Sequence, residues 1–239
     1  MNKTYMITSG VGGVGKTTVA IALAYGFAKR GIKALLIETI PGCGVLDLIL
    51  HDTSPILYNL DDVLDGTVEK DDVIITSELG FSYICAPASE CYKYSKTELI
   101  RFIKLLKQQY DIIIIDTSSG FSDIHKWLIP HTDTIIFTVT PQITDVRITS
   151  RFVSLYYRYK IKDTRLIINK VPDELPLSCG LDDLDTVIDM VGVQLLGALP
   201  IDNINSLTKP NEYTKKLELE SLSIVGRLLG EENDLALYK

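Results

Sequence analysis

The sequence predicts a doubly wound α/β domain, in which helices flank both faces of a mostly parallel sheet. Strand-like and helical segments alternate along the chain, the pattern produced when parallel strands are joined by helical crossovers. Several strand-like segments are continuous runs of isoleucine, leucine and valine, as in strands buried on both faces. The 239 residues contain no internal repeat, low-complexity tract or long linker, so residues 1–239 are expected to form one domain.

These patterns assign the elements in chain order. Strands are predicted over residues 4–8, 34–38, 81–86, 111–116, 134–140, 165–169 and 195–199. The unbroken isoleucine run at 112–115 is the clearest of them. Helices are predicted over residues 16–30, 96–109, 144–159, 181–191 and 213–229. Residues 172–180, rich in proline, aspartate and serine, are expected to form an exposed loop.

Composition points to a cytoplasmic protein. No apolar run approaches the roughly 20 residues of a membrane span, and residues 3–8 already read as a strand rather than a signal peptide. The four cysteines show no C-x-x-C spacing, which favours reduced thiols. The net charge of −7 disfavours strong nonspecific DNA binding. Basic residues gather between 147 and 165, either as a local patch or as a solvated helix face.

The strongest motif lies at residues 10–18. It reads Gly10-Val11-Gly12-Gly13-Val14-Gly15-Lys16-Thr17-Thr18 and matches the phosphate-binding pattern G-x-x-x-x-G-K-[ST]. A predicted strand precedes it and a predicted helix follows it, which is the setting that this motif requires. The sequence therefore predicts a binding site for a nucleoside triphosphate.

Each residue type in this motif has a physical reason. Glycines leave room for backbone N–H groups to surround phosphates, and the positive end of the following helix faces the same anion. Lys16 is expected to reach the β- and γ-phosphates, and Thr17 to supply a hydroxyl to Mg²⁺.

A carboxylate at a strand end completes the predicted metal site. The apolar strand over 111–116 ends in Asp116, which is expected to hold Mg²⁺ through water. The alternative is that Asp116 caps a helix.

With these residues placed, the chain resembles the MinD/ParA group of P-loop ATPases, a SIMIBI-type nucleotide-binding fold, and is most similar to its MinD-type members. The matching segments cover nearly the whole chain. They lie at residues 7–18, 57–66, 86–89, 110–116, 167–170, 196–200 and 226–231.

The resemblance implies ATP or ADP with Mg²⁺ as cofactors, a nucleotide-dependent homodimer and a regulatory protein partner. It implies catalytic roles for Lys16, Glu38 and Asp116. It also implies that Asn169 recognises adenine, because an amide offers both a donor and an acceptor. Pro200 is expected to close the other side of the base pocket.

Three departures from the group affect the expected activity. Val11 stands where the group carries a lysine that reaches the partner's phosphates. Ile40 replaces the second acid of an Asp-x-Asp pair, which orients the attacking water, while Glu38 keeps a carboxylate that could support Mg²⁺ at longer reach. The acidic tail over residues 231–239 lacks the apolar face of a membrane-targeting helix, so no autonomous membrane binding is expected.

These observations favour a nucleotide-switched positioning protein with weak ATPase activity. The alternatives are an ATPase whose missing cation comes from Lys3 or a partner protein, and an interaction module that has lost its dependence on nucleotide. A P-loop kinase is a weaker fourth hypothesis, because no arginine-rich lid is evident in the sequence.

Overall fold

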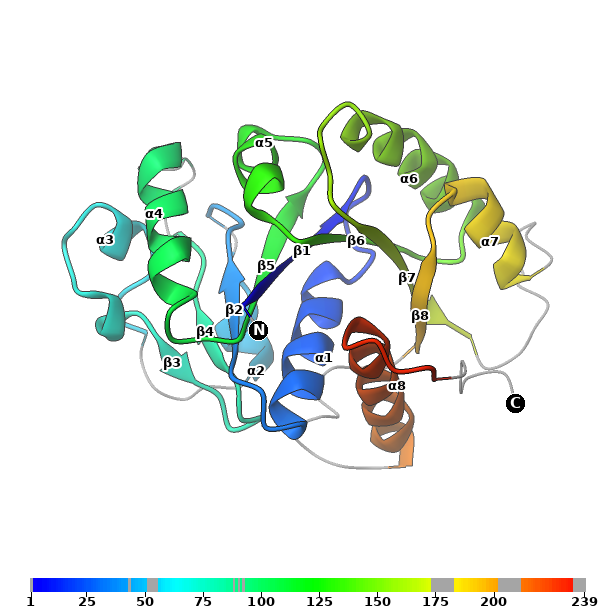
Figure 1. Cartoon of the computed structure of the whole chain (residues 1–239), viewed down its shortest axis with the longest axis horizontal. Coiled ribbons are helices and arrows are strands. Elements are labelled where there is room, and N and C mark those ends of the chain that lie inside the picture. Colours follow the sequence, from blue (N-terminus) through cyan, green and yellow to red (C-terminus); the bar gives the residue numbers. More distant parts are fainter. Residues whose placement is uncertain are drawn as a thin grey trace.

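The computed structural model describes residues 2–42, 44–50, 56–87, 89, 91, 93–172, 183–201 and 212–233, excluding the side chains of residues 212–214. A central sheet lies between two layers of helices (Figure 1). Strand order is β3-β4-β2-β5-β1-β6-β7-β8, and every neighbouring pair is parallel except β3 with β4. The predicted fold class is therefore confirmed.

The strands agree closely with the predicted runs. They are β1 (Lys3–Ser9), β2 (Ala34–Glu38), β3 (Ile75–Thr76), β4 (Ser82–Ile84), β5 (Ile112–Ser119), β6 (Thr134–Val139), β7 (Thr164–Val171) and β8 (Leu195–Pro200). Central strands β1 and β5 are buried on both faces, which explains the unbroken isoleucine run of β5. The two-residue edge strand β3 carries no such signal and was not predicted.

The helices form two layers with separate cores. They are α1 (Lys16–Lys29), α2 (Leu46–Leu50), α3 (Leu60–Leu64), α4 (Lys96–Leu106), α5 (Asp123–Leu128), α6 (Ile143–Tyr156), α7 (Leu184–Val191) and α8 (Glu212–Leu228), with short 3₁₀ turns η1 (Lys70–Asp72) and η2 (Ile129–His131). Helices α1, α2 and α8 contribute buried side chains to one core, and α3 to α7 contribute to the other. The five predicted helices correspond to α1, α4, α6, α7 and α8.

Close packing of α1 on α8 depends on a glycine. A Cβ at Gly26 would lie 2.9 Å from the backbone oxygen of Ser221 and 2.8 Å from a methyl carbon of Val225. Backbone cannot yield as a flexible side chain can, so only glycine lets the two helices approach this closely. Helix α1 is thereby fixed beneath β1, and its first turn is fixed at the end of that strand.

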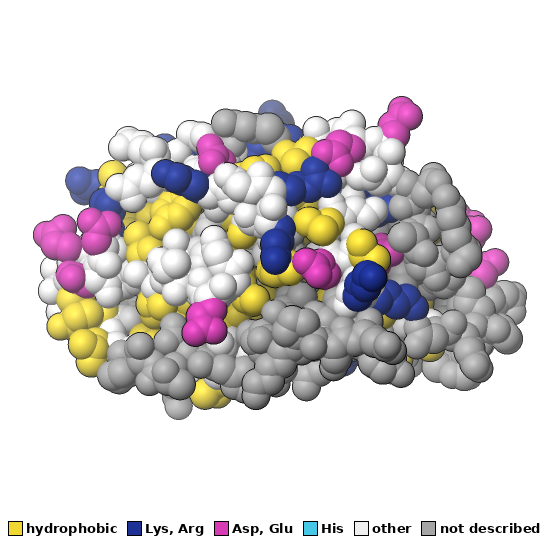
Figure 2. Space-filling view, turned by 90° about the horizontal axis from the view of Figure 1, so that it is seen from below, with side chains coloured by type: hydrophobic (Ala, Val, Ile, Leu, Met, Phe, Trp, Pro, Cys, Tyr) yellow, Lys and Arg dark blue, Asp and Glu magenta, His cyan; other side chains and the backbone are white. Residues whose placement is uncertain are grey.

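Charged side chains are interspersed over the underside of the molecule. Where Figure 2 draws described residues, Lys and Arg are scattered among Asp and Glu and between hydrophobic patches, without a large field of one sign. Within the described segments, no helix combines the length and apolar character needed to cross a bilayer.

Three predictions about the chain stay predictions. Most of the loop at 172–180 and residues 234–239 of the tail lie outside the described residues. The expectation of a single domain over residues 1–239 is likewise untested.

Candidate functional site

The phosphate motif lies at the carboxyl end of β1, where doubly wound sheets bind their ligands. Gly13 and Gly15 adopt positive φ angles of 76° and 88°, which bend the loop back toward α1. A Cβ at Gly10 would lie 2.9 Å from the Cβ of Phe152, so this position has no room for a side chain. The predicted need for glycine thus has a local cause at each of these three positions.

The first turn of α1 is left open for an anion. Its N-cap residue, Gly15, offers no capping side chain, and the first turn contains no acidic residue. The free N–H groups and the positive end of the helix therefore have no competing carboxylate on this turn. Lys16 begins the helix and is only 8% exposed, so its ammonium is held near the loop. Burial lowers the pKa of Lys16, while Asp116 opposes that shift.

The two predicted magnesium ligands are in direct contact. The Thr17 hydroxyl donates to Oδ2 of Asp116 at 2.6 Å. Asp116 is 0% exposed, and its other oxygen, Oδ1, is a buried acceptor with no hydrogen-bond partner among the described residues. A hydroxyl and a carboxylate with an unused oxygen are suitable donors for Mg²⁺, so these residues fit the predicted metal.

The charge of Asp116 is poorly stabilised without a ligand. Burial raises its pKa from 3.8 to about 7, against the lowering effects of the Thr17 hydrogen bond and of Lys16. Glu38 lies level with Asp116 on the neighbouring strand β2 and contributes to the rise. A divalent cation here would favour the ionised carboxylate.

Glu38 is held by backbone amides. Its Oε1 accepts from the Val45 N–H at 3.0 Å, and its Oε2 from the Ala86 N–H at 3.3 Å. Burial raises the pKa of Glu38, whereas the backbone hydrogen bonds, including one from Leu46, lower it. These contacts anchor the chain that enters α2, and the expected catalytic role of Glu38 draws no support from them and stays a prediction.

Two consecutive residues at the end of β7 clamp the phosphate loop. Asn169 Nδ2 donates to the carbonyl of Val14 at 2.8 Å, and Lys170 Nζ donates to the carbonyl of Gly13 at 2.7 Å. A Cβ at Gly15 would overlap the same Asn169 nitrogen. Lys170 has a φ of 58°, the one positive value among the described residues other than glycine.

This clamp orients the loop amides. In a trans peptide the carbonyl of one residue points away from the N–H of the next. Holding the Gly13 and Val14 carbonyls toward β7 therefore turns the N–H groups of Val14 and Gly15 to the opposite side. Lys170 lies in one of the matching segments of the sequence, but this contact with the loop was not predicted. Its adjacency to Asn169 was the available signal.

Asn169 and Pro200 lie at the carboxyl ends of neighbouring strands, β7 and β8. Pro200 pairs with Val171 in the strand register, and the amide of Ile201 continues that pairing at 3.1 Å. Because one Asn169 nitrogen hydrogen is used by the loop, its Oδ1 and second N–H are the groups left for a base. Adenine recognition by Asn169 and Pro200 stays a prediction.

Two of the departures from the group, Val11 and Ile40, lie beside this site. Val11 is half-buried, and its N–H donates to Ser9 Oγ at 3.1 Å. Ile40 is also half-buried, just beyond the end of β2. Neither aliphatic side chain can replace a cation or an acid.

His125 is a further buried polar residue near the site that the sequence reasoning missed. The Ser122 N–H donates to its Nδ1 at 3.1 Å, which leaves the hydrogen on Nε2 for the Thr117 hydroxyl oxygen at 3.0 Å. That hydroxyl donates to the Ile7 carbonyl at 2.7 Å. Burial lowers the pKa of His125 to about 4, so the neutral ring links β1, β5 and α5. The Ser-x-x-His spacing at the start of α5 was the only sequence signal.

The comparisons with known proteins agree with this geometry. The family model for the CobQ/CobB/MinD/ParA nucleotide binding domain matches residues 5–212. The putative septum site-determining protein MinD of Oltmannsiellopsis viridis is 30% identical over 243 residues, covering 97% of this chain and 77% of that protein.

Two solved structures support the fold. The MinC:MinD cell division protein complex of Aquifex aeolicus has a TM-score of 0.85 at 23% identity and covers 98% of both chains. MinD of Pyrococcus horikoshii, complexed with Mg-ADP, has a TM-score of 0.79 at 22% identity, covering 95% of this chain and 96% of that one. The chain belongs to the CobQ/CobB/MinD/ParA family of nucleotide-binding domains.

Proposed function

We propose that this protein is an ATP- and Mg²⁺-dependent switch that dimerises with ATP bound, hydrolyses ATP slowly and positions other components in the cell. The observation that carries the proposal is the contact of Thr17 with Asp116 beside an open, glycine-lined helix N-terminus. An interaction module that had lost its dependence on nucleotide would gain nothing from keeping a buried carboxylate with an unused oxygen.

The chain's own residues account for binding. The N–H groups of the phosphate loop and the Lys16 ammonium would hold the phosphates, and Thr17 and Asp116, which already touch each other, would hold the metal. Mg²⁺ would supply charge neutralisation at the β- and γ-phosphates. Asp116 would hold the cation as a carboxylate, because the positive charge would offset the cost of burying the negative one.

Slow hydrolysis follows from what surrounds this site. Val11 provides no cation toward a partner's phosphates, and the loss of a comparable arginine costs a factor of about 10³–10⁵ in related phosphoryl transfers. Ile40 provides no acid for a water molecule, and the backbone contacts of Glu38 engage the remaining carboxylate on that segment.

A second function is favoured by the same contacts of Glu38. If no group in the chain can orient water, the protein would act as an ATP-binding module of a pilus, flagellar or partition system. It would then hydrolyse ATP only with a partner, or not at all. MinD of Aquifex aeolicus was solved as a complex with MinC, which supports a protein partner for this chain.

Calorimetric titration with Mg-ATP tests nucleotide binding. We expect micromolar affinity in the wild type and none in Lys16→Ala. Lys29→Ala removes an exposed lysine at the other end of α1 and is the matched control, which should bind normally. Absence of binding in the wild type would refute the proposal.

Turnover and size-exclusion measurements test the switch. The wild type alone should turn over far below 1 s⁻¹ and should dimerise with a slowly hydrolysed ATP analogue but not with ADP. Val11→Lys restores the missing cation and should raise turnover. Rapid hydrolysis by the isolated wild type would contradict the slow switch, and activity that appears only with a partner protein would favour the second function.

A further inference from the structure

A hollow lined by cations lies on the outer face of α4, facing the 3₁₀ turn η2. Its volume is about 330 Å³, and its lining residues are Lys96, Thr97, Ile100, Arg101, Lys104 and His131. None of them belongs to the phosphate loop. Lys96, Ile100 and Lys104 follow one another at four-residue spacing, so they form one ridge of the helix, and Arg101 lies on the adjacent ridge. Ile100 is buried and makes an apolar floor.

Among the described residues, no acid lines this hollow, although Arg101 and Lys104 also border a neighbouring hollow whose walls include Asp65, Glu69 and Glu98. Across the described part of the chain, Lys96, Arg101 and Lys104 make no ion pair. The acid in the same turn, Glu98, is engaged by the Ser95 N–H at 2.6 Å as part of the helix cap. In a protein of net charge −7, a hollow whose described lining has three cations and no acid is a local concentration of positive charge.

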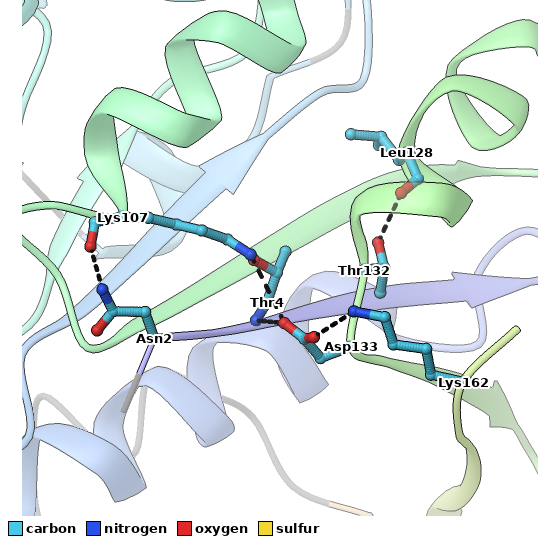
Figure 3. Close-up of polar contacts among 7 residues, drawn as sticks. All are labelled: Asn2, Thr4, Lys107, Leu128, Thr132, Asp133 and Lys162. Carbon is cyan, nitrogen blue, oxygen red and sulfur yellow. Dashed lines mark hydrogen bonds and ion pairs between the residues drawn. The ribbon is translucent and has the colours of Figure 1, made fainter.

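Two neighbouring lysines, Lys107 and Lys162, form ion pairs with the same acid, Asp133. Asp133 accepts from Lys162 at 2.8 Å, lies 3.6 Å from Lys107 and also accepts from the Thr4 N–H at 2.9 Å (Figure 3). Asp133 therefore balances the charge of both lysines and holds them near the amino-terminal ends of β1 and β6. Lys96 and Lys104 have no carboxylate within ion-pair distance among the residues that the structure describes.

The wall opposite α4 is held in place. His131 ends η2, and the next residue, Thr132, donates from its hydroxyl to the Leu128 carbonyl at 3.0 Å (Figure 3). Asp133, the residue after it, is held by the Thr4 N–H and by Lys162. Burial lowers the pKa of His131, and the positive charges of Lys104, Lys96, Lys107 and Lys162 lower it further. The imidazole is therefore a neutral wall that can donate or accept a hydrogen bond at neutral pH.

We infer that this hollow is a second anion site, separate from the nucleotide site, which binds a phosphate-bearing ligand. Two ammonium groups and one guanidinium converge on a space at the small end of ligand-pocket volumes. A guanidinium can hold two oxygens of one phosphate, and the flanking ammonium groups match its second negative charge. The ligand is a soluble phosphorylated molecule or the phosphate of a lipid headgroup.

Isotope-edited NMR of the full chain with saturating Mg-ADP isolates this site from the phosphate loop. Inorganic phosphate is the first probe, compared with chloride at equal ionic strength. Signals from residues 96–104 and 131 should move with phosphate alone, and the effect should weaken with added salt. Binding to vesicles containing phosphatidic acid, against neutral phosphatidylcholine, is the second arm.

Paired variants decide the outcome. Arg101→Gln with Lys104→Gln should weaken binding by about tenfold, because two charged hydrogen-bond donors are lost at an exposed site. Arg147→Gln with Arg151→Gln removes the same charge from the exposed face of α6 and is the control. Lys96→Gln provides a second variant if the pair unfolds.

Phosphate binding that the α4 variants lose and the control retains would support a soluble ligand. The same pattern with vesicles only would support a lipid headgroup. Equal losses in both variant pairs, or no response to either probe, would overturn the inference. Neither result would bear on nucleotide binding, which is measured separately.

Discussion

Replacing Asp116 with asparagine is predicted to stabilise the ligand-free protein and to remove its magnesium-dependent nucleotide binding. The carboxylate is 0% exposed, and one of its oxygens has no hydrogen-bond partner among the described residues. Asparagine has nearly the same size, can still accept the Thr17 hydroxyl and carries no charge. The substitution thus removes the desolvation cost and retains the main contact.

The size of the effect follows from the pKa of Asp116, which burial raises from 3.8 to about 7. Between these values the folded protein binds the proton more tightly than the unfolded chain, so wild-type stability falls as the pH rises. Each pH unit in this window corresponds to about 1.4 kcal/mol, which gives about 4 kcal/mol in total. Between about pH 5.5 and 7.5, the advantage of the variant should widen by about 2 kcal/mol.

Urea unfolding followed by circular dichroism, with EDTA and without nucleotide, measures this difference. Titrating groups away from the site act equally in both proteins and cancel from the comparison, whereas Glu38 and Lys16 interact with the Asp116 charge and contribute to the measured difference. Asp123→Asn removes an exposed carboxylate and controls for the change in net charge. Parallel pH profiles of the wild type and the Asp116 variant would show that the buried carboxylate carries no such cost.

Three further substitutions probe neighbouring contacts. Thr17→Val removes a metal donor and the hydrogen bond to Asp116, so calorimetry should show ATP affinity falling about 10–100-fold with Mg²⁺ and little without it. Lys170→Met removes the contact with the Gly13 carbonyl and leaves an unfavourable positive φ, so nucleotide affinity should fall, and Lys170→Arg should restore part of it. Asp133→Asn should cost about 1 kcal/mol in urea unfolding at pH 7; because its hydrogen bonds and nearby lysines lower the pKa of Asp133, the cost should vanish as the pH falls below about 4.

Much of the fold could be predicted because the signals were local. Strands β2, β5, β6 and β7 contain runs of isoleucine or leucine that are buried on both faces, and these sequences record that burial directly. The short elements α2, α3 and α5 span five or six residues and carry too few positions for a periodic signal. Their ends are fixed by tertiary contacts, such as the grip of Glu38 on Val45, which a sequence does not display.

The residues of the site also fall into those that the sequence predicted and those that it did not. The phosphate loop and Asp116 could be predicted because a motif and a strand end fix their places on the backbone. The clamp by Asn169 and Lys170 joins residues about 155 positions apart in the chain, and only the folded sheet brings them together. The hydrogen bonds of His125 likewise depend on the angle at which α5 leaves β5.

The two buried acids of the site show how one departure changes another residue's role. Glu38 and Asp116 lie level on adjacent strands, and burial raises the pKa of each. The longer side chain of Glu38 reaches the amides of Val45 and Ala86, so its charge is satisfied by backbone. Asp116 has one hydroxyl donor and an unused oxygen, so its charge awaits an external cation. Because backbone N–H groups already satisfy Glu38, we expect Asp116 to be the main carboxylate ligand for a metal at this site.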